Sequence, residues 1–173
     1  RYGKPISEDG TINNAYFSIH SDGTNEKDTT KGINEAIKYA SKNNIKYIKL
    51  ETGNYLINGV YNELNIVGGI VLKSNICFDL NNSKIIQVDC KEIKYSMLGL
   101  NCIENVVIQN GTIIGDRNNH NYEGIDSTHE WGYGIEIKSC ENIEIRNVEI
   151  LNTTGDGIII TSIYKDGFKI SNN

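Results

Sequence analysis

The sequence predicts an all-β fold, a parallel β-helix of short stacked strands with an N-terminal capping α-helix. Strand-like segments recur along the chain, their asparagines coincide when the segments are aligned, and one amphipathic segment precedes them. The 173 residues are enough for one domain with a core, and 38% of them are hydrophobic. We divide the chain into an N-terminal segment with the capping helix, residues 1–58, and the stacked coils, residues 59–173.

The segment KDTTKGINEAIKYASKNN, residues 27–44, predicts the helix. Asp28 or Thr29 is placed to cap its first turn. A stack of strands exposes apolar rows and unpaired backbone at its end, so we expect the helix to cover that end. The alternating segment IKYIKLETGNYLI then predicts two strands that break at residues 52–54. The residues spaced for the apolar face of the helix are Ile33, Ala36, Ile37 and Ala40.

Four segments that begin at Gly69, Ser96, Gly134 and Gly157 predict the coils. Apolar and polar residues alternate in each of them, which indicates strands with one buried face. Such strands bury that face by stacking in coils of about 22 to 28 residues. The expected apolar rows are Ile70, Leu98, Ile135 and Ile158; Leu72, Leu100, Ile137 and Ile160; Phe78, Val106, Ile143 and Phe168; and Leu80, Ile108, Ile145 and Ile170. The coinciding asparagines, expected to form a hydrogen-bonded ladder at the bends, are Asn82, Asn110, Asn147 and Asn172.

Charge and composition exclude some functions. The net charge is -5 and there is no basic run, so we expect no nucleic-acid partner. No apolar run approaches the roughly 18 residues of a membrane span, so we expect no membrane partner. The four cysteines form no CxxC pair; they are either free thiols or include a disulfide between Cys102 and Cys140. The chain stops at Asn173, partway round a coil, and we expect it to be a fragment of a longer protein.

One irregularity in the repeat points to a functional site. Asn110 and Asn147 are 37 residues apart, whereas Asn147 and Asn172 are 25 apart. The surplus, GDRNNHNYEGIDSTHEWGY, lies between Ile114 and Gly134 and predicts a loop on one side of the stack. Aligning Gly134 with Gly157 places Asp156 beside Tyr133, and therefore close to Glu130.

An aromatic ring beside carboxylates suits a saccharide, and two carboxylates can hydrolyse a glycosidic bond as acid and base or nucleophile. The predicted catalytic residues are Glu130 with Asp156 or Asp116. The predicted substrate-binding residues are Trp131, Tyr133, His129, Arg117 and Glu136.

These residues also have structural interpretations. Trp131 could hold the loop against the strands, and Asp116 and Asp156 could serve the backbone of Gly-Asp turns. Arg117 could be an ion-pair partner, and His120 and His129 could be solvated or hydrogen-bonded, because their spacing matches no usual metal pattern. We expect no cofactor, with calcium on Asp116, Glu123 and Asp126 as the alternative.

The stretch from DGTNEKDTTKG to TGNYLI, residues 22–57, resembles the opening of pectate-lyase-like right-handed parallel β-helix proteins, in which a capping helix precedes a G-x-Y-x-I turn. A later run is similar to phage and prophage pre-neck appendage-like or tailspike-like proteins. It contains Gly115-Asp116-Arg117, His129-Glu130-Trp131-Gly132 and Gly155-Asp156-Gly157. The resemblance implies a right-handed coil, a virion or extracellular location, a polysaccharide partner and a homotrimeric full-length protein.

We therefore expect a phage tailspike-like or appendage-like domain that recognises a cell-surface polysaccharide. A further hypothesis is that the domain also cleaves that polysaccharide, as a hydrolase or a lyase. One alternative is a secreted polysaccharide lyase or glycoside hydrolase of the same superfamily. The other is a non-catalytic structural or adhesion segment. The polygalacturonase motifs N-T-D, D-D and G-H-G are not matched, because the chain has Asn152-Thr153-Thr154 and a single Asp156.

Overall fold

Two parallel sheets and an N-terminal helical layer make up the computed structural model, which describes residues 3–60, 68–124 and 128–162. The helices are α1 (Asn14–Phe17) and α2 (Glu26–Lys42). A five-stranded sheet contains β1 (Tyr47–Lys49), β2 (Asn54–Ile57), β4 (Cys77–Gln87), β6 (Glu104–Ile114) and β8 (Glu141–Leu151). A four-stranded sheet contains β3 (Ile70–Val71), β5 (Lys94–Asn101), β7 (Trp131–Lys138) and β9 (Ile158–Thr161).

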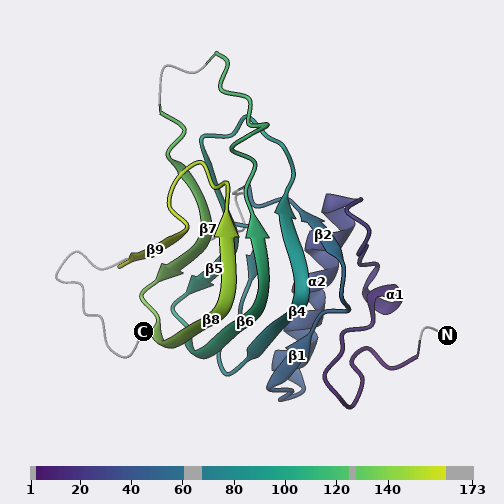
Figure 1. Ribbon diagram of the computed structural model, residues 1–173. Helices are drawn as coiled ribbons and strands as arrows, with labels where there is room; N and C mark the ends of the chain where they lie inside the picture. The colour runs from purple at the N-terminus through teal and green to yellow at the C-terminus, as the bar shows by residue number, and fades with distance from the viewer. Residues whose placement is uncertain (1–2, 61–67, 125–127, 163–173) are drawn as a thin grey trace.

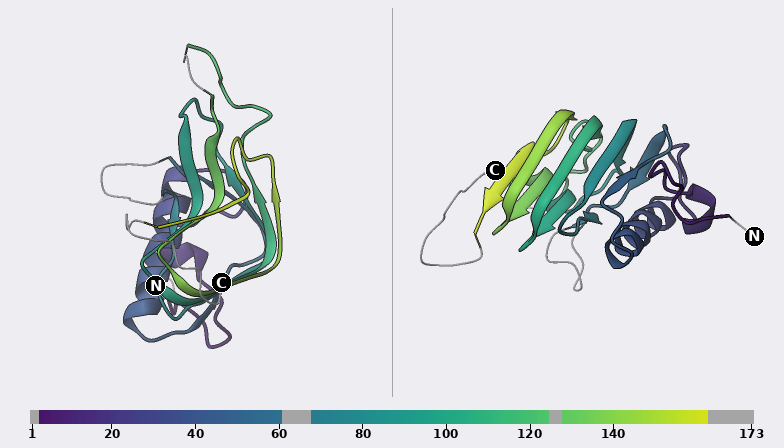
Figure 2. Two further views of the ribbon diagram at one scale, coloured as in Figure 1. Left: turned by 90° about the vertical axis from the view of Figure 1, so that its left-hand side faces the viewer. Right: turned by 90° about the horizontal axis from the view of Figure 1, so that it is seen from below.

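From β3 onward the chain alternates between the two sheets, and each strand pairs in parallel with the strand two places later. The strands therefore follow one another from the end where α2 lies to β9 (Figure 2). The short strands β1 and β2 both pair with β4, on either side of the break at residues 50–53. Apolar side chains of both sheets and of α2 form one buried cluster.

The predicted fold class is wrong. The described residues form two separate parallel sheets with helices, an α/β-type arrangement, and not one closed all-β solenoid (Figure 1). Period-two alternation specifies which face of a strand is buried, and the repeat specifies which strands stack. Neither pattern specifies that successive strands close into a coil, so the inference from stacked strands to a β-helix went further than the residues allow.

The stacking register was predicted better than the fold class. Ile70, Leu98, Ile135 and Ile158 are in register, and so are Leu100, Ile137 and Ile160. The two rows from the other sheet are displaced by two residues at β4, because Phe78 pairs with Ile108 rather than Val106. The cause is a bulge between Asp79 and Ser83, after which the predicted offset is restored at Ser83 and Gly111. Phe168 and Ile170 lie outside the described residues.

The predicted asparagine ladder is present at one rung. Asn147 Nδ2 donates to Asn110 Oδ1 at 3.3 Å, and both residues have positive φ, as does Asn82. Asn110 Nδ2 donates to Asp79 Oδ2 rather than to Asn82, because the bulge displaces that corner. Asn172 lies outside the described residues. A second ladder, Asn75, Asn105 and Asn142, escaped the sequence analysis.

Helix α2 covers the first strands, as predicted. Its four expected apolar residues are fully buried, and Asn34 bonds to the backbone of the β3 region through Gly69 O and Val71 N, both at 2.8 Å. The helix begins earlier than expected: Asn25 takes the cap position in the left-handed conformation, so neither Asp28 nor Thr29 is the cap. All four cysteines are free, which excludes the Cys102–Cys140 disulfide. In the described part of the chain, no helix has the length and apolar character needed to cross a membrane.

Candidate functional site

Three connections between the sheets lie at one end of the strands (Figure 1). Residues 88–93 join β4 to β5, residues 152–157 join β8 to β9, and the described residues between β6 and β7 are 115–124 and 128–130. Because the strands stack in parallel, successive connections are neighbours. Asn121 N donates to Cys90 O at 3.0 Å, Arg117 N to Asn152 O at 2.9 Å, and Gly155 N to Gly132 O at 2.8 Å. We call these three connections the loop cluster.

A chain of buried polar side chains forms the interior of the loop cluster. Asp116 Oδ2 accepts from Cys90 N at 3.0 Å and lies 2.7 Å from His120 Nδ1. His120 Nε2 lies 2.6 Å from His129 Nδ1. The side chains of Asp116 and His120 have no exposed surface, and His129 is 5% exposed. Cys90 Sγ completes the group, 3.9 Å from His120 Nδ1.

The hydrogen bonds define a consistent set of protons for neutral imidazoles. An ionised Asp116 accepts from His120 Nδ1–H, which leaves His120 Nε2 as an acceptor. His129 must then donate through Nδ1–H, and its Nε2 carries a lone pair. That Nε2 and the second carboxylate oxygen of Asp116 are both buried without a hydrogen-bond partner. A buried polar atom without a partner is costly, so this cluster has an unused capacity to bind.

Tyrosines and a thiol surround the buried chain. The Tyr122 ring lies 4.7 Å from the His120 ring and 5.2 Å from the His129 ring, and about half of the residue is exposed. Burial, with a smaller contribution from the Asp116 charge, raises the pKa of Tyr95 to about 12. Burial also raises the pKa of the Cys90 thiol to about 12, again with Asp116 adding to the effect. The interior of the loop cluster therefore disfavours additional negative charge.

Three of the predicted residues lie on the surface of the loop cluster. Trp131, the first residue of β7, is 53% exposed, and Glu130 beside it is also exposed. Asp156 is exposed on the neighbouring connection, where its carbonyl oxygen accepts from Gly134 N at 3.3 Å. Gly155 packs directly against the Glu130 carbonyl group. The predicted juxtaposition of Asp156 with Tyr133 and the Glu130 segment is thus present in the backbone.

The other predicted residues lie elsewhere. Asp116 and His129 belong to the buried chain, and Tyr133 and Glu136 are 4% and 2% exposed. Burial raises the pKa of Tyr133, with the charges of Glu136 and Asp156 adding to it, and Glu136 Oε1 pairs with Lys138 Nζ at 2.9 Å. These four residues therefore do not present their side chains to a ligand on the described surface.

Arg117 is exposed and links two of the connections, because its Nη2 donates to Thr154 O at 3.4 Å. Of the alternative calcium ligands, Glu123 is exposed, Asp116 is engaged in the buried chain, and Asp126 lies outside the described residues.

Sequence reasoning missed Cys90 and gave His120 and Tyr122 no committed role. The repeat offered no signal for this contact. At the end of β4 next to the loop cluster the strands pair at an offset of 28 residues, as Ser83 does with Gly111. That offset would place Cys90 beside Asn118, whereas Cys90 lies beside His120, 30 residues away.

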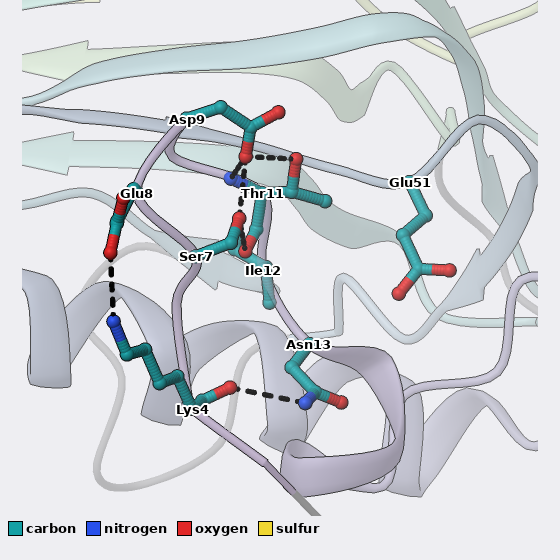
Figure 3. Close-up of a pocket in the computed structure, with 8 residues that line it drawn as sticks. All are labelled: Lys4, Ser7, Glu8, Asp9, Thr11, Ile12, Asn13 and Glu51. Carbon is teal, nitrogen blue, oxygen red and sulfur yellow. Dashed lines mark hydrogen bonds and ion pairs between the residues drawn. The ribbon is translucent and has the colours of Figure 1, made fainter.

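A separate pocket of about 690 Å³ lies near the N-terminus, and none of its lining residues belongs to the loop cluster (Figure 3). Its acidic groups are engaged locally: Asp9 pairs with Lys49 at 2.8 Å and accepts from Ser7 and Thr11. The Lys49 interaction is the largest cause of a lowered pKa at Asp9. Glu8 pairs with Lys4 at 3.0 Å. These contacts stabilise the N-terminal segment and leave the loop cluster as the better candidate site.

Comparison with known proteins gives two partial sequence matches. No protein-family model matches the chain. It is 40% identical over 155 residues to the SPbeta prophage-derived uncharacterized protein YorA of Bacillus subtilis (strain 168), a match that covers 84% of this chain and 26% of YorA. It is 35% identical over 157 residues to the uncharacterized protein YclG of the same strain, covering 87% of this chain and 26% of YclG. The chain thus spans about a quarter of the length of the curated relatives it matches.

The fold is also similar to that of a solved structure. It is a crystal structure of a protein from Parabacteroides merdae ATCC 43184 that is named, provisionally, a glycosyl hydrolase. The TM-score is 0.65 at 20% sequence identity, and the match covers 85% of this chain and 67% of that one. Identity at this level shows a shared fold, and function has to be argued from the site.

Proposed function

We propose that this chain is the polysaccharide-binding part of a phage- or prophage-encoded surface protein, and that it cleaves the glycan it binds. The observation that carries the proposal is the exposed Trp131 ring, held next to Glu130 and beside the connection that bears Asp156. An indole face packs on the apolar C–H face of a sugar ring, and carboxylates accept hydrogen bonds from its hydroxyl groups.

Glu130 and Asp156 are the proposed catalytic pair. Both are exposed, and they belong to adjacent connections whose backbones are hydrogen-bonded through Gly132 and Gly155. One carboxyl group would protonate the oxygen of the leaving sugar, and the other would activate water or attack the anomeric carbon. Asp116 is no longer proposed for this role, because its buried carboxylate already accepts from Cys90 and lies against His120.

The names of two similar proteins support the two parts of the proposal separately. The YorA protein is prophage-derived by name, which agrees with the resemblance to phage appendage-like sequences. The Parabacteroides merdae protein of similar fold is named, provisionally, a glycosyl hydrolase, and that name favours a second candidate, a secreted glycoside hydrolase unrelated to phage. The two candidates share the chemistry of the loop cluster and differ in the glycan they would recognise.

Release of reducing ends from bacterial capsular or teichoic glycans tests the proposal. We expect wild-type protein to release them, and Glu130→Gln or Asp156→Asn to lower the rate by about 10²–10⁴-fold while glycan binding is retained. Glu104→Gln is the matched control, because Glu104 is exposed at the opposite end of β6 from the loop cluster. Equal rates in the control and in both site variants would contradict catalysis.

Binding is tested apart from cleavage. Trp131→Ala should weaken glycan binding about tenfold or more, whereas Tyr16→Ala, which removes an exposed aromatic ring from α1, should not. Unchanged affinity in the Trp131 variant would contradict the proposed binding surface. Activity confined to plant or host polysaccharides would favour the secreted hydrolase over the phage protein.

A further inference from the structure

We propose that Cys90, Asp116 and His120 form a binding site for a divalent transition-metal ion, with zinc as the ion that fits best. Each residue offers one ligand atom, and the three atoms lie within 4.8 Å of one another. They come from two different connections of the loop cluster, so a bound ion would join residues 88–93 to residues 115–124. This site is separate from the exposed residues proposed to act on the glycan.

The separations need only small adjustments. Zinc bonds of about 2.0–2.3 Å in a tetrahedron place neighbouring ligand atoms roughly 3.3–3.7 Å apart. Cys90 Sγ and His120 Nδ1 are 3.9 Å apart, and Asp116 Oδ2 and His120 Nδ1 are 2.7 Å apart. Shifts of several tenths of an ångström at the side chains would bring both pairs into that range. Three protein ligands would also leave a fourth position for water or another group.

One buried atom of the proposed ligands points independently to a missing partner. Asp116 Oδ1 is buried without a hydrogen-bond partner, and the residue is 3% exposed. Asp116 can therefore offer a free oxygen to an ion from a carboxylate that is otherwise held in place. A cluster that was only structural would be expected to satisfy this atom.

The donor set selects the ion. A thiol, an imidazole and a carboxylate together suit zinc, whereas calcium and magnesium require oxygen ligands. His129 would act as a positioning residue. With the ion on His120 Nδ1, His120 Nε2–H donates to His129 Nδ1 over the observed 2.6 Å, which fixes the ring and its tautomer. On metal binding, the proton of His129 Nδ1 moves to His120 Nε2 along this hydrogen bond. The proton lost from His120 Nδ1 passes to solvent, and His129 Nε2 takes up one from solvent. The Cys90 thiol also releases its proton to solvent as its thiolate binds the ion, so metal affinity should rise with pH.

Such an ion would stabilise the segment that presents the proposed glycan surface. His129 immediately precedes Glu130 and Trp131, and its ring lies against His120 with centroids 4.8 Å apart. Holding the His120 ring in place would therefore also hold His129 and the residues that follow it into β7. Metal binding should raise the thermal stability of the protein, because an ion that binds only the folded state stabilises it by mass action.

Cobalt(II) and zinc(II) titrations of chelator-treated protein test the inference. We expect one equivalent of cobalt to produce a sulfur-to-cobalt charge-transfer band, zinc to displace it, and both ions to raise the melting temperature. Cys90→Ser should abolish the band, whereas the matched control Cys140→Ser, which replaces another partly buried free thiol, should retain it. His129→Gln should weaken zinc affinity by about 10–100-fold and leave the band in place at saturation.

Three outcomes would overturn the site. They are no metal uptake by folded wild-type protein, an identical band in Cys90→Ser, and loss of the band in Cys140→Ser alone. Circular dichroism of each metal-free variant separates loss of binding from loss of fold. Because none of these measurements uses a glycan, failure of the metal site and failure of the proposed function are distinguishable.

Discussion

Gly155 and Gly157 flank Asp156 and differ sharply in the space around them. A β-carbon at Gly155 would overlap the carbonyl group of Glu130, whereas one at Gly157 would meet only Ile150 at an ordinary distance of 3.6 Å. The close approach at Gly155 is what places the Asp156 connection against the Glu130 segment. The backbone of this one residue therefore determines the geometry of the proposed catalytic pair.

We predict that Gly155→Ala separates the two connections. Overpacking of this kind costs about 1–3 kcal/mol of stability, and the displacement should also lower glycan cleavage. Gly157→Ala is the matched control and should change neither property greatly. Chemical denaturation and the reducing-end assay measure the two effects. A Gly155 variant as stable and active as the control would show that the contact is unimportant.

Tyr55 gives a prediction at alkaline pH. Its side chain is fully buried, its hydroxyl donates to Glu51 O and accepts from Asn14 Nδ2, and burial raises its pKa from 10 to about 12. The folded state thus keeps a proton that the unfolded state loses above pH 10. Stability from this group is complete below pH 10 and is lost as the pH rises toward 12.

Tyr55→Phe should be less stable than wild type at pH 8 by about 1 kcal/mol, because two hydrogen bonds are removed. Between pH 10 and 12 the difference should shrink, since only the wild type loses the Tyr55 contribution. Urea unfolding at several pH values measures it. Parallel pH profiles for the two proteins would contradict the assignment.

At the scale of the elements, short asparagine ladders hold successive strands in register at their bends. Asn105 Nδ2 donates to Asn75 Oδ1 at 3.1 Å and Asn105 Oδ1 accepts from Asn142 Nδ2 at 2.6 Å. All three residues have positive φ, which asparagine tolerates better than most residues. Side chain and backbone therefore both favour asparagine at this corner.

Replacing Asn105 separates these two effects. Asn105→Gly loses the two ladder bonds and should cost about 1 kcal/mol. Asn105→Ala loses the same bonds and also places a β-carbon in the left-handed region, which should add about 1–2 kcal/mol. Thermal unfolding measures the difference between the variants. Equal stability of the glycine and alanine variants would contradict the backbone part of the account.

Local patterns predicted the elements well and their closure badly. The apolar face of α2, the rows of β3, β5, β7 and β9, and the insertion after Ile114 all follow from spacing along the chain. The bulge at residues 79–83 was not predicted, because it inserts residues without changing the alternation on either side. The fold class was wrong because closure depends on how bends orient successive sheets, which alternation does not record.

At the scale of the whole molecule, sequence reasoning located the long loop but did not distinguish its exposed side chains from its buried ones. Glu130, Trp131 and Asp156 are exposed, as a ligand-binding role requires. Asp116 and His129 were expected at the same surface and are buried beneath it. Side-chain orientation within a loop follows no period, so the sequence could locate the loop but could not distinguish its surface from its interior.

The main prediction is that glycan binds on the surface of the loop cluster and stacks on the adjoining Trp131, which is the only tryptophan of the chain. Its fluorescence therefore reports on this site alone. The most direct measurement is acrylamide quenching of that fluorescence, with and without a saturating glycan whose binding has been established by calorimetry. We predict that the glycan protects the 53% exposed indole and lowers the quenching constant. A bound glycan that leaves the quenching constant unchanged would contradict the claim.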